Sequence, residues 1–211
     1  MSDKLYDAVL TGDAKSAVAA TREALEANAD PVVLVSKYMI PAMDEVGRRF
    51  QCEDYFVPEL LLSARAMRGA LELIKPLLAE RGSEPVARVV IGTVKGDLHD
   101  IGKNLVAYML EGGGFEVIDL GADVAPDRFV EAVRDKRAHL VCLSALLTVT
   151  MPSMKTTIQA LKDAGIRESV RVMVGGAPVT PQYAGEIGAD AYAADATAAV
   201  AKARELVARA S

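Results

Sequence analysis

The chain has 211 residues, of which 51% are hydrophobic and 25% are charged, a composition typical of a folded globular protein. Its net charge is −5, and the sequence has no basic run that could replace the counterions of a nucleic acid, so a DNA or RNA partner is not expected. The first residues lack the profile of a signal peptide, and no apolar run reaches membrane-spanning length. These features predict a cytoplasmic protein without membrane contact.

The chain has two cysteines, Cys52 and Cys142, which lie far apart in the sequence. Two lone thiols in a chain without an export signal are typical of a reducing compartment. We therefore expect both cysteines to be reduced and buried, and neither to form a disulfide or a zinc site.

The first part of the chain carries helical patterns only. Asp13 is a candidate N-cap, and Asp30 followed by Pro31 predicts a helix start, because a carboxylate caps free N–H groups and proline is tolerated at the first helical position. Pro41 is expected to kink the helix that follows, and a further helix is expected to begin within residues 54–58. The apolar residues at helical spacing predict a small antiparallel bundle.

A polar segment with glycine and proline, residues 80–85, breaks the helical pattern and predicts a domain boundary. The predicted domains are a helical bundle over residues 1–82 and an α/β domain over residues 86–211.

Beyond the boundary, strands and helices alternate. Strands are expected at residues 86–91, 115–120, 140–143, 170–174 and 190–193, and helices at residues 101–112, 126–137, 151–164, 181–187 and 197–210. This alternation predicts a parallel sheet covered on both faces. Together with the bundle, the expected fold class is α plus α/β: an antiparallel helical bundle followed by a flavodoxin-like (Rossmann-like), doubly wound, five-stranded domain.

The most informative stretch follows the first expected strand and runs from Gly96 to Gly102. It places Asp97 two residues before His99, in a loop at the carboxyl end of a strand, where open α/β sheets bind ligands. This pair suits metal ligation, because one ring nitrogen of an imidazole can bind a metal while the other donates to a carboxylate. Taken alone, the pair would equally fit a capped helix start with a surface imidazole.

Further loops are expected at the same edge of the sheet. Their small and hydroxyl-bearing residues are Ser144 and Thr148 after the third strand and Gly175 and Gly176 after the fourth. Residues without bulky side chains leave room for a large ligand. Ser144 could also cap the next helix, and the two glycines could form an ordinary turn.

Three motifs together carry a resemblance to a known family: Asp97-x-His99-x-x-Gly102, Ser144-x-Leu146 and Gly175-Gly176. They are similar to the signature of corrinoid proteins that bind cobalamin through a protein histidine in place of the cofactor's own base (base-off/His-on). The resemblance covers almost the whole chain, because residues 55–61 look like the helical cap of methionine synthase and of small corrinoid methyl carriers. It extends to the corrinoid proteins of methanol- and methylamine-type methyltransferase systems.

The resemblance implies cobalamin as cofactor, as methylcobalamin, hydroxocobalamin or a related corrinoid. His99 would be the lower axial ligand of cobalt, Asp97 would accept the other imidazole N–H, and Ser144 would extend this relay. Gly102 would let the helix start approach the corrin. The other residues implied in binding the cofactor are Gly96, Asp100, Ile101, Leu146, Thr148, Gly175 and Gly176, with Phe56, Leu60 and Leu61 of the bundle over the upper face. These three bundle residues could equally be core.

The implied function is that of a methyl carrier that is not catalytic by itself. It would move a methyl group from a substrate-specific methyltransferase to a second methyltransferase, with coenzyme M or tetrahydrofolate as acceptor, and a reductive activation protein would be a further partner. Exposing the cofactor to a partner would require the bundle to move aside, so residues 82–85 are expected to act as a hinge between the two domains. The methyl donor stays open among methanol, methylamines, betaines and aromatic methyl ethers.

Three other functions compete with the carrier. The first is a cobalamin-dependent sensor or regulator, and the second is a mutase subunit that uses adenosylcobalamin. The third is a flavodoxin-like domain for FMN or phosphoacceptor signalling, which fits poorly because Ser144 stands where a receiver needs an aspartate.

Overall fold

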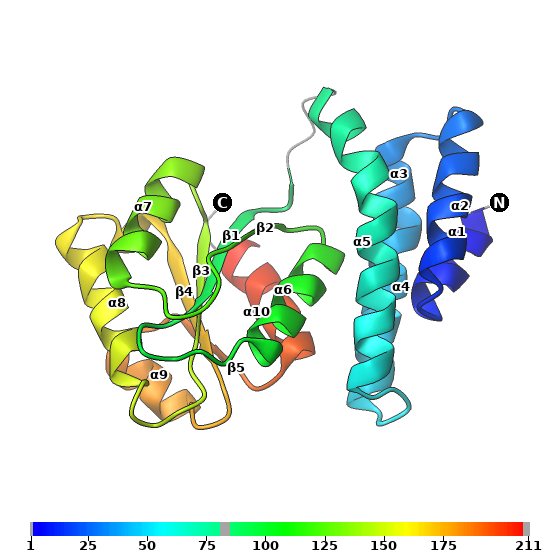
Figure 1. Cartoon of the computed structure of the whole chain (residues 1–211). Coiled ribbons are helices and arrows are strands. Elements are labelled where there is room, and N and C mark those ends of the chain that lie inside the picture. Colours follow the sequence, from blue (N-terminus) through cyan, green and yellow to red (C-terminus); the bar gives the residue numbers. More distant parts are fainter. Residues whose placement is uncertain (1, 81–84, 209–211) are drawn as a thin grey trace. The chain divides into compact units, whose positions relative to one another are not determined.

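A computed structural model describes residues 2–80 and 85–208 of the chain. It contains two compact units, Met1–Val86 with Tyr108–Gly114, and Ala87–Ala107 with Phe115–Ser211 (Figure 1). The hinge expected at residues 82–85 lies, apart from Pro85, outside the described residues. Of the helices in the described ranges, none is both long and apolar enough to span a membrane.

The N-terminal unit is helical. Its elements are α1 (Ser2–Leu10), α2 (Ala14–Glu26), α3 (Pro31–Leu34), a π-helical segment (Val35–Met39), α4 (Ile40–Gln51) and α5 (Val57–Glu80). The side chains of Asp13 and Asp30 accept hydrogen bonds from the backbone N–H groups of the following helices, so both predicted N-caps are confirmed. The centre of this unit is filled by fully buried apolar side chains: Leu5, Met39, Leu60, Met67 and Ile74.

The π-helical segment stands directly before Pro41. Proline has no N–H and cannot complete the regular ladder of a helix. Ahead of it, the N–H of Ile40 donates to the carbonyl of Val35, five residues back. This turn of the helix therefore contains one residue more than a regular α-helical turn. The irregularity expected at Pro41 therefore takes the form of a π-turn.

The two cysteines differ in exposure. Cys142 lies in the middle of a buried strand, as expected, but Cys52 is exposed. The prediction of two buried thiols is therefore wrong for Cys52. The reason is its position, since Cys52 is the C-cap of α4 and lies between Gln51 and Glu53, which are also exposed.

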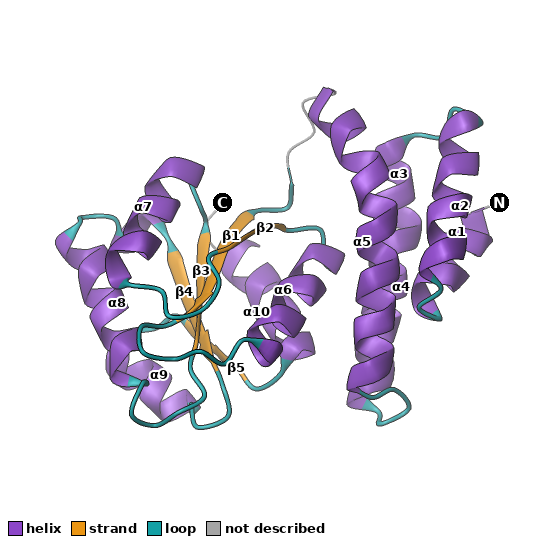
Figure 2. Cartoon of the chain, in the orientation of Figure 1, coloured by secondary structure: helices purple, strands orange, loops and turns teal. Residues whose placement is uncertain are grey.

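The C-terminal unit alternates strands and helices. Its strands are β1 (Arg88–Thr93), β2 (Glu116–Asp119), β3 (Leu140–Ser144), β4 (Arg171–Gly175) and β5 (Ala191–Ala193). Its helices are α6 (Ile101–Gly112), α7 (Pro126–Lys136), α8 (Pro152–Asp163), a short 3-10 helix (Arg167–Ser169), α9 (Pro181–Ile187) and α10 (Ala196–Ala208). All strand pairs are parallel in the order β2-β1-β3-β4-β5, which confirms the predicted doubly wound sheet (Figure 2).

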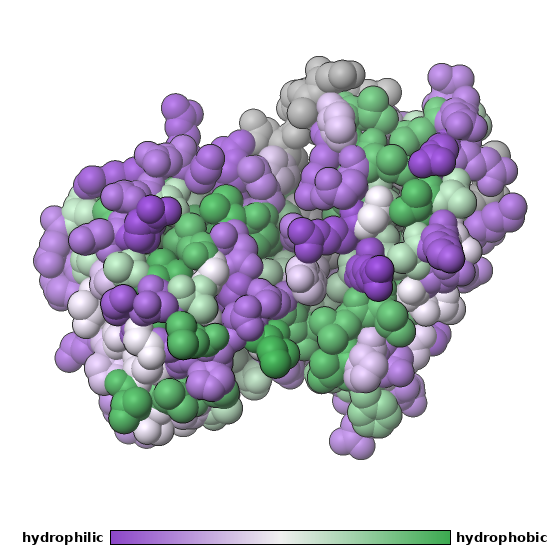
Figure 3. Space-filling model, viewed as in Figure 1, coloured by the Kyte–Doolittle hydropathy of each residue, from purple (hydrophilic) through white to green (hydrophobic). Residues whose placement is uncertain are grey.

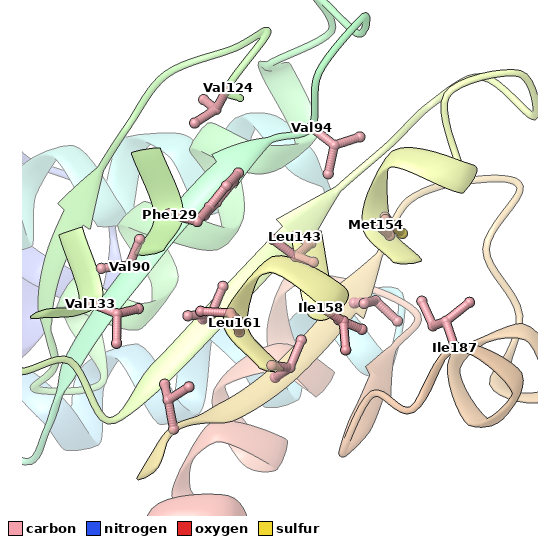
Figure 4. Packing of buried hydrophobic residues seen from close by; sticks show 14 of the residues in the cluster. Val90, Val94, Val124, Phe129, Val133, Leu143, Met154, Ile158, Leu161 and Ile187 are labelled. Atoms are coloured by element: carbon pink, nitrogen blue, oxygen red, sulfur yellow. The ribbon is translucent and has the colours of Figure 1, made fainter. Parts of the chain in front are cut away.

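Helices cover both faces of this sheet. In Figure 2, α7, α8 and α9 lie on one face, and α6 and α10 lie on the other. The first face holds the main core, in which Phe129, Met154, Ile158 and Leu161 pack against the strand residues (Figure 4). A Cβ atom at Gly92 would lie 2.8 Å from the ring of Phe129, so the glycine in β1 makes room for this aromatic side chain.

The register of the sheet brings the motif residues into one row. Thr93 at the end of β1 pairs with Ser144 at the end of β3, and Ser144 pairs with Gly175 at the end of β4. Because the strands are parallel, the loops that follow these residues leave the same edge of the sheet. Figures 1 and 2 show these loops gathered at the lower end of the C-terminal unit.

Candidate functional site

The centre of the site is the carboxylate of Asp97 in the β1–α6 loop, whose side chain has no exposed surface. Its Oδ1 accepts from the backbone N–H of His99 at 3.0 Å and lies 2.8 Å from Nδ1 of the His99 ring. Its Oδ2 accepts from the backbone N–H groups of Leu146 and Leu147 at 2.8 and 3.3 Å, and from the hydroxyl of Thr150 at 2.7 Å. One buried carboxylate thus joins the histidine to the loop after β3.

These donors keep Asp97 ionised. Burial raises the pKa of this carboxyl, because a low-dielectric surrounding disfavours charge. The hydrogen bonds from Thr150, from the N–H of Leu146 and from His99 outweigh burial and hold the pKa of Asp97 well below its usual range. An ionised carboxylate can only accept, so Nδ1 of His99 carries the proton of the bond between them.

The imidazole of His99 is therefore oriented with one nitrogen turned to the protein and the other available. Half of its side-chain surface is exposed. With the proton on Nδ1, the lone pair is on Nε2, and no residue in the described ranges donates to that atom. This is the arrangement in which histidine binds metals, with a carboxylate behind the ring fixing its tautomer and orientation.

Two residues that the sequence motifs do not include hold the backbone of the same loop. The hydroxyl of Thr93, a fully buried residue, donates to the carbonyl of His99 at 2.9 Å. The carboxylate of Asp123, after β2, accepts from the N–H of Gly96 at 2.8 Å and pairs with Lys95. Thr93 stands inside a strand and Asp123 belongs to a different loop, so neither shows its role in a local sequence pattern.

The glycines of the motifs have different surroundings. A Cβ atom at Gly102, in the first turn of α6, would meet nothing within 4 Å, so the space beside this residue is open. At Gly176, where φ is +132°, a Cβ atom would overlap the carbonyl oxygen of Ala145. Gly102 thus leaves room for a ligand, whereas Gly176 lets two loops of the site approach each other.

Exposed apolar side chains surround His99. Leu98 and Ile101 flank it in sequence and are 76% and 80% exposed, and Leu146, Leu147 and Val149 of the β3–α8 loop are also exposed. Figure 3 shows hydrophobic surface at the lower end of the C-terminal unit, where these loops lie in Figure 1. Apolar side chains left in water around one imidazole suit a broad, largely apolar ligand.

The other predicted residues divide between the two units. Gly96, Asp100, Ser144, Thr148 and Gly175 lie on or next to the site loops. The structure does not bring the hydroxyl of Ser144 to Asp97, and Thr150 takes that place because its side chain turns back onto Oδ2.

In the helical unit, the three residues expected over the cofactor differ in exposure. Phe56 and Leu61 are exposed, at 62% and 40%, and remain able to contact a ligand. Leu60 has no exposed surface, which fits a place in the bundle core.

The chain matches two family models, each described as a B12 binding domain, over residues 1–75 and 87–203. It is 44% identical over 206 residues to "Dimethylamine corrinoid protein 1" of Methanosarcina acetivorans, covering 97% of this chain and 96% of that protein. It is equally similar to "Trimethylamine corrinoid protein 1" of the same organism, over 97% and 95% of the two chains.

Among solved structures, the methanol:cobalamin methyltransferase complex of Methanosarcina barkeri contains a similar chain. The match has a TM-score of 0.87 and 28% sequence identity, and it covers 97% of this chain and 78% of that chain. The family models match most of the chain, and the relatives match it along nearly their full length. The chain therefore belongs to the B12-binding corrinoid proteins.

Proposed function

We propose that this protein binds a corrinoid through His99 and carries a methyl group on its cobalt between two methyltransferases. The observation that carries this proposal is the pairing of a buried, ionised Asp97 with a half-exposed His99 whose Nε2 points to no protein donor in the described ranges. A corrin brings most of the cobalt's ligands itself, so one imidazole is the ligand that the protein would add.

The residues present fit such a cofactor. The open space beside Gly102 would accept the macrocycle near the helix start. The exposed apolar side chains of Leu98, Ile101 and Val149 would lie against it and exclude water. The displaced base of the cofactor would lie along Ser144, Thr148 and the glycine pair at residues 175–176. When bound, the corrinoid supplies a cobalt centre that accepts and releases the methyl group.

In this role, the protein's own residues would hold the cofactor and shield it from water. Nε2 of His99 would bind the cobalt, and Asp97 would keep the ring from rotating and its proton on Nδ1. Thr93 and Asp123 would keep the loop backbone in place beneath the ring. In the helical unit, the apolar side chains of Phe56 and Leu61 are exposed and therefore available to a ligand.

A carrier of this kind needs partner enzymes. The relatives named for dimethylamine and trimethylamine favour, as first partner, a methyltransferase whose substrate holds its methyl group on nitrogen. A second methyltransferase would pass the group to coenzyme M or tetrahydrofolate, and a reductive activation protein would restore the reduced cofactor. The sensor alternative finds no support in these relatives.

The test is methyl transfer in a reconstituted system. The protein loaded with hydroxocobalamin and reduced would be mixed with a purified trimethylamine methyltransferase and trimethylamine, and methylation would be followed by absorbance. A methanol methyltransferase with methanol, and the His99→Ala variant, are the controls. We expect methylation with the amine pair only. A loaded wild-type protein that no enzyme methylates would contradict the carrier role, and methylation by the methanol pair alone would contradict the donor class.

A further inference from the structure

Lys103, in the first turn of α6, is the only buried lysine within residues 2–80 and 85–208, and its side chain is 2% exposed. Lysine is almost never fully buried unless its charge is paired. The ammonium of Lys103 donates to both carboxylate oxygens of Asp119, at 2.7 and 2.5 Å, and to Oδ1 of Asn104 at 2.6 Å. An ammonium has three protons, so each proton has an acceptor and the group is held in one place.

The position of this charge is unfavourable in two ways. A cation in the first turn of a helix is opposed by the positive end of the helix dipole, and a buried ammonium loses its hydration. An apolar side chain of similar length, such as methionine, would fill the same space without either cost. Filling space therefore does not explain a lysine at this position, whereas holding α6 to a fixed partner does.

Asp119 gives the ammonium a rigid partner. It is the last residue of β2, where its backbone pairs with Ile91 of β1. Its Oδ1 also accepts from the backbone N–H of Gly121 at 2.8 Å. The carboxylate is thus fixed by the strand and by the turn that follows it. The ion pair with Lys103 therefore joins the first turn of α6 to the end of β2.

Lys103 also sets the direction of the Asn104 amide. Lysine only donates hydrogen bonds, so Asn104 turns its Oδ1 to Lys103 and its Nδ2 to Oδ2 of Asp100, at 3.1 Å. The backbone N–H of Asn104 donates to the carbonyl of Asp100 at 2.7 Å. Asp100 directly follows His99. A continuous chain of polar contacts thus runs from the end of β2 to the residue next to His99.

This chain and Asp97 act on different parts of the loop. Asp97 meets the His99 ring, whereas in the described part of the chain neither Lys103 nor Asn104 bonds to that ring or to Asp97. We propose that Lys103 is a positioning residue: its ion pair with Asp119 holds the start of α6 and thereby fixes where the backbone of His99 stands when the ring binds cobalt. This inference rests on the proposed function for its meaning, but not for its first test.

The first test needs no cofactor, because NMR of the apo full-length chain reports amide exchange and the tautomer of His99. Lys103→Met removes the charge and keeps the length of the side chain. We expect the Asn104 amide proton to exchange about tenfold faster, relative to the amides of β3, because the helix start opens more often without its charged hydrogen bonds. The Nδ1–H form of His99 should persist, since Asp97 is intact. Lys202→Met, which removes an exposed partner of Glu205, is the control and should change neither. Unchanged exchange in Lys103→Met, or an equal rise in the control, would overturn the proposal.

Stability should distinguish the two members of the pair. Asp119 is 38% exposed, so water can solvate its carboxylate when Lys103 is replaced. Asp119→Asn instead leaves a buried ammonium without a carboxylate. We expect the midpoint of urea unfolding to fall further in Asp119→Asn than in Lys103→Met, and to return to the Lys103→Met value in the double variant. Equal midpoints for the two single variants would contradict a buried ammonium that depends on Asp119.

The second test uses the loaded protein in the absence of urea. We expect Lys103→Met to lower cobalamin affinity by about tenfold, as for other residues behind a metal ligand. It should also reduce the fraction of bound cofactor that has a histidine nitrogen in its electron paramagnetic resonance spectrum, and Lys202→Met should retain that fraction. A Lys103→Met protein that is less stable but keeps the fraction in full would show that Lys103 only stabilises the fold. If the wild type retains no cobalamin, the proposed function fails, while the exchange result still decides whether Lys103 holds α6.

A measurement on the wild type alone covers the case in which Lys103→Met does not fold. The ammonium protons of a solvated lysine exchange rapidly with water, whereas protons held by three buried acceptors exchange slowly. We expect a slowly exchanging Nζ signal for Lys103, with a nuclear Overhauser contact to the side-chain amide protons of Asn104. An Nζ signal of Lys103 that exchanges as fast as that of Lys202 would contradict the assignment.

Discussion

Nδ1 of His99 lies 2.8 Å from Oδ1 of Asp97, and the two side chains differ sharply in exposure. The Asp97 side chain has no exposed surface, whereas half of the His99 side chain is open to solvent. The protein thus buries the carboxylate that orients the ring and leaves the ring's other nitrogen accessible. This difference in exposure distinguishes a histidine that can bind a metal from the histidine of an ordinary helix-capping pair.

Asp97→Asn tests this relationship directly. The amide has nearly the same shape, but it lacks the charge that holds the proton on Nδ1 of His99. We expect the dissociation constant for cobalamin to rise by about 10- to 100-fold, measured by absorbance titration. Asp135→Asn, on the exposed side of α7, makes the same change in net charge and should leave binding unaltered. Equal affinities for both variants would show that Asp97 does not support the ligand.

Two glycines of the signature are predicted to fail in different ways when replaced by alanine. At Gly176 the added methyl group would overlap Ala145, and the backbone has a positive φ, so the free energy of unfolding should fall by at least about 1–3 kcal/mol. At Gly102 nothing lies within 4 Å, and the residue is helical, so stability should stay the same or rise by up to about 1 kcal/mol.

Cobalamin binding should separate the two variants further. Gly102→Ala should bind the cofactor more weakly despite its intact fold, because its methyl group enters the space left for the ligand. Urea unfolding and cobalamin titration of both proteins check this pair. A Gly102→Ala protein with wild-type affinity would mean that the space beside this residue is not used by the cofactor.

The pH dependence of stability should report on Glu45 in α4. Hydrogen bonds from Arg48 and Arg49 lower the pKa of Glu45 from 4.5 to about 2. A lowered pKa in the folded state means that the contribution to stability is present above the unfolded value and is lost as the pH falls toward 2. Wild type should therefore be more stable than Glu45→Gln at pH 7, by a small amount because solvent screens the pair. Urea unfolding curves at decreasing pH should show a shrinking difference in the free energy of unfolding between wild type and Glu45→Gln. A difference that stays constant with pH would exclude this ion pair as its source.

The two thiols should react differently. Cys52 is exposed, whereas burial raises the pKa of the Cys142 thiol well above its usual range. Since the thiolate is the reactive form, a thiol reagent should modify Cys52 in the folded protein and Cys142 only after unfolding. Mass spectrometry of the labelled peptides checks this order, and Cys52→Ser should remove the fast reaction. Fast labelling of Cys142 in the native protein would show that β3 opens readily.

The sequence predicts the fold well because its signals are local. Asp13 and Asp30 cap helices where the pattern of carboxylate and proline places them, and α9 spans the expected residues. The first strand is displaced from the expected residues 86–91 to Arg88–Thr93, since Val86 is half exposed and lies outside the sheet. Apolar character alone does not show where pairing begins.

The site is predicted less completely, because part of it depends on contacts between distant loops. Asp97 and His99 are adjacent on one loop, and their pairing follows from their spacing. The hydroxyl that reaches Asp97 comes from a residue 53 positions later in the chain, and the choice between Ser144 and Thr150 depends on how the β3–α8 loop turns. Thr93 and Asp123 act on the backbone of the His99 loop, which leaves no periodic signal in the sequence.

The measurement that tests the central claim most directly is electron paramagnetic resonance of the cob(II)alamin-loaded protein. The protein would be labelled uniformly with nitrogen-15 and loaded with unlabelled cobalamin, so that an axial nitrogen from the protein can be told from the cofactor's own base. With His99 as the ligand, the nitrogen splitting of the cobalt signal should change from a triplet in unlabelled protein to a doublet in labelled protein, and it should vanish in His99→Ala. A triplet that persists in the labelled protein would show that the cofactor keeps its own base and that His99 is not the ligand.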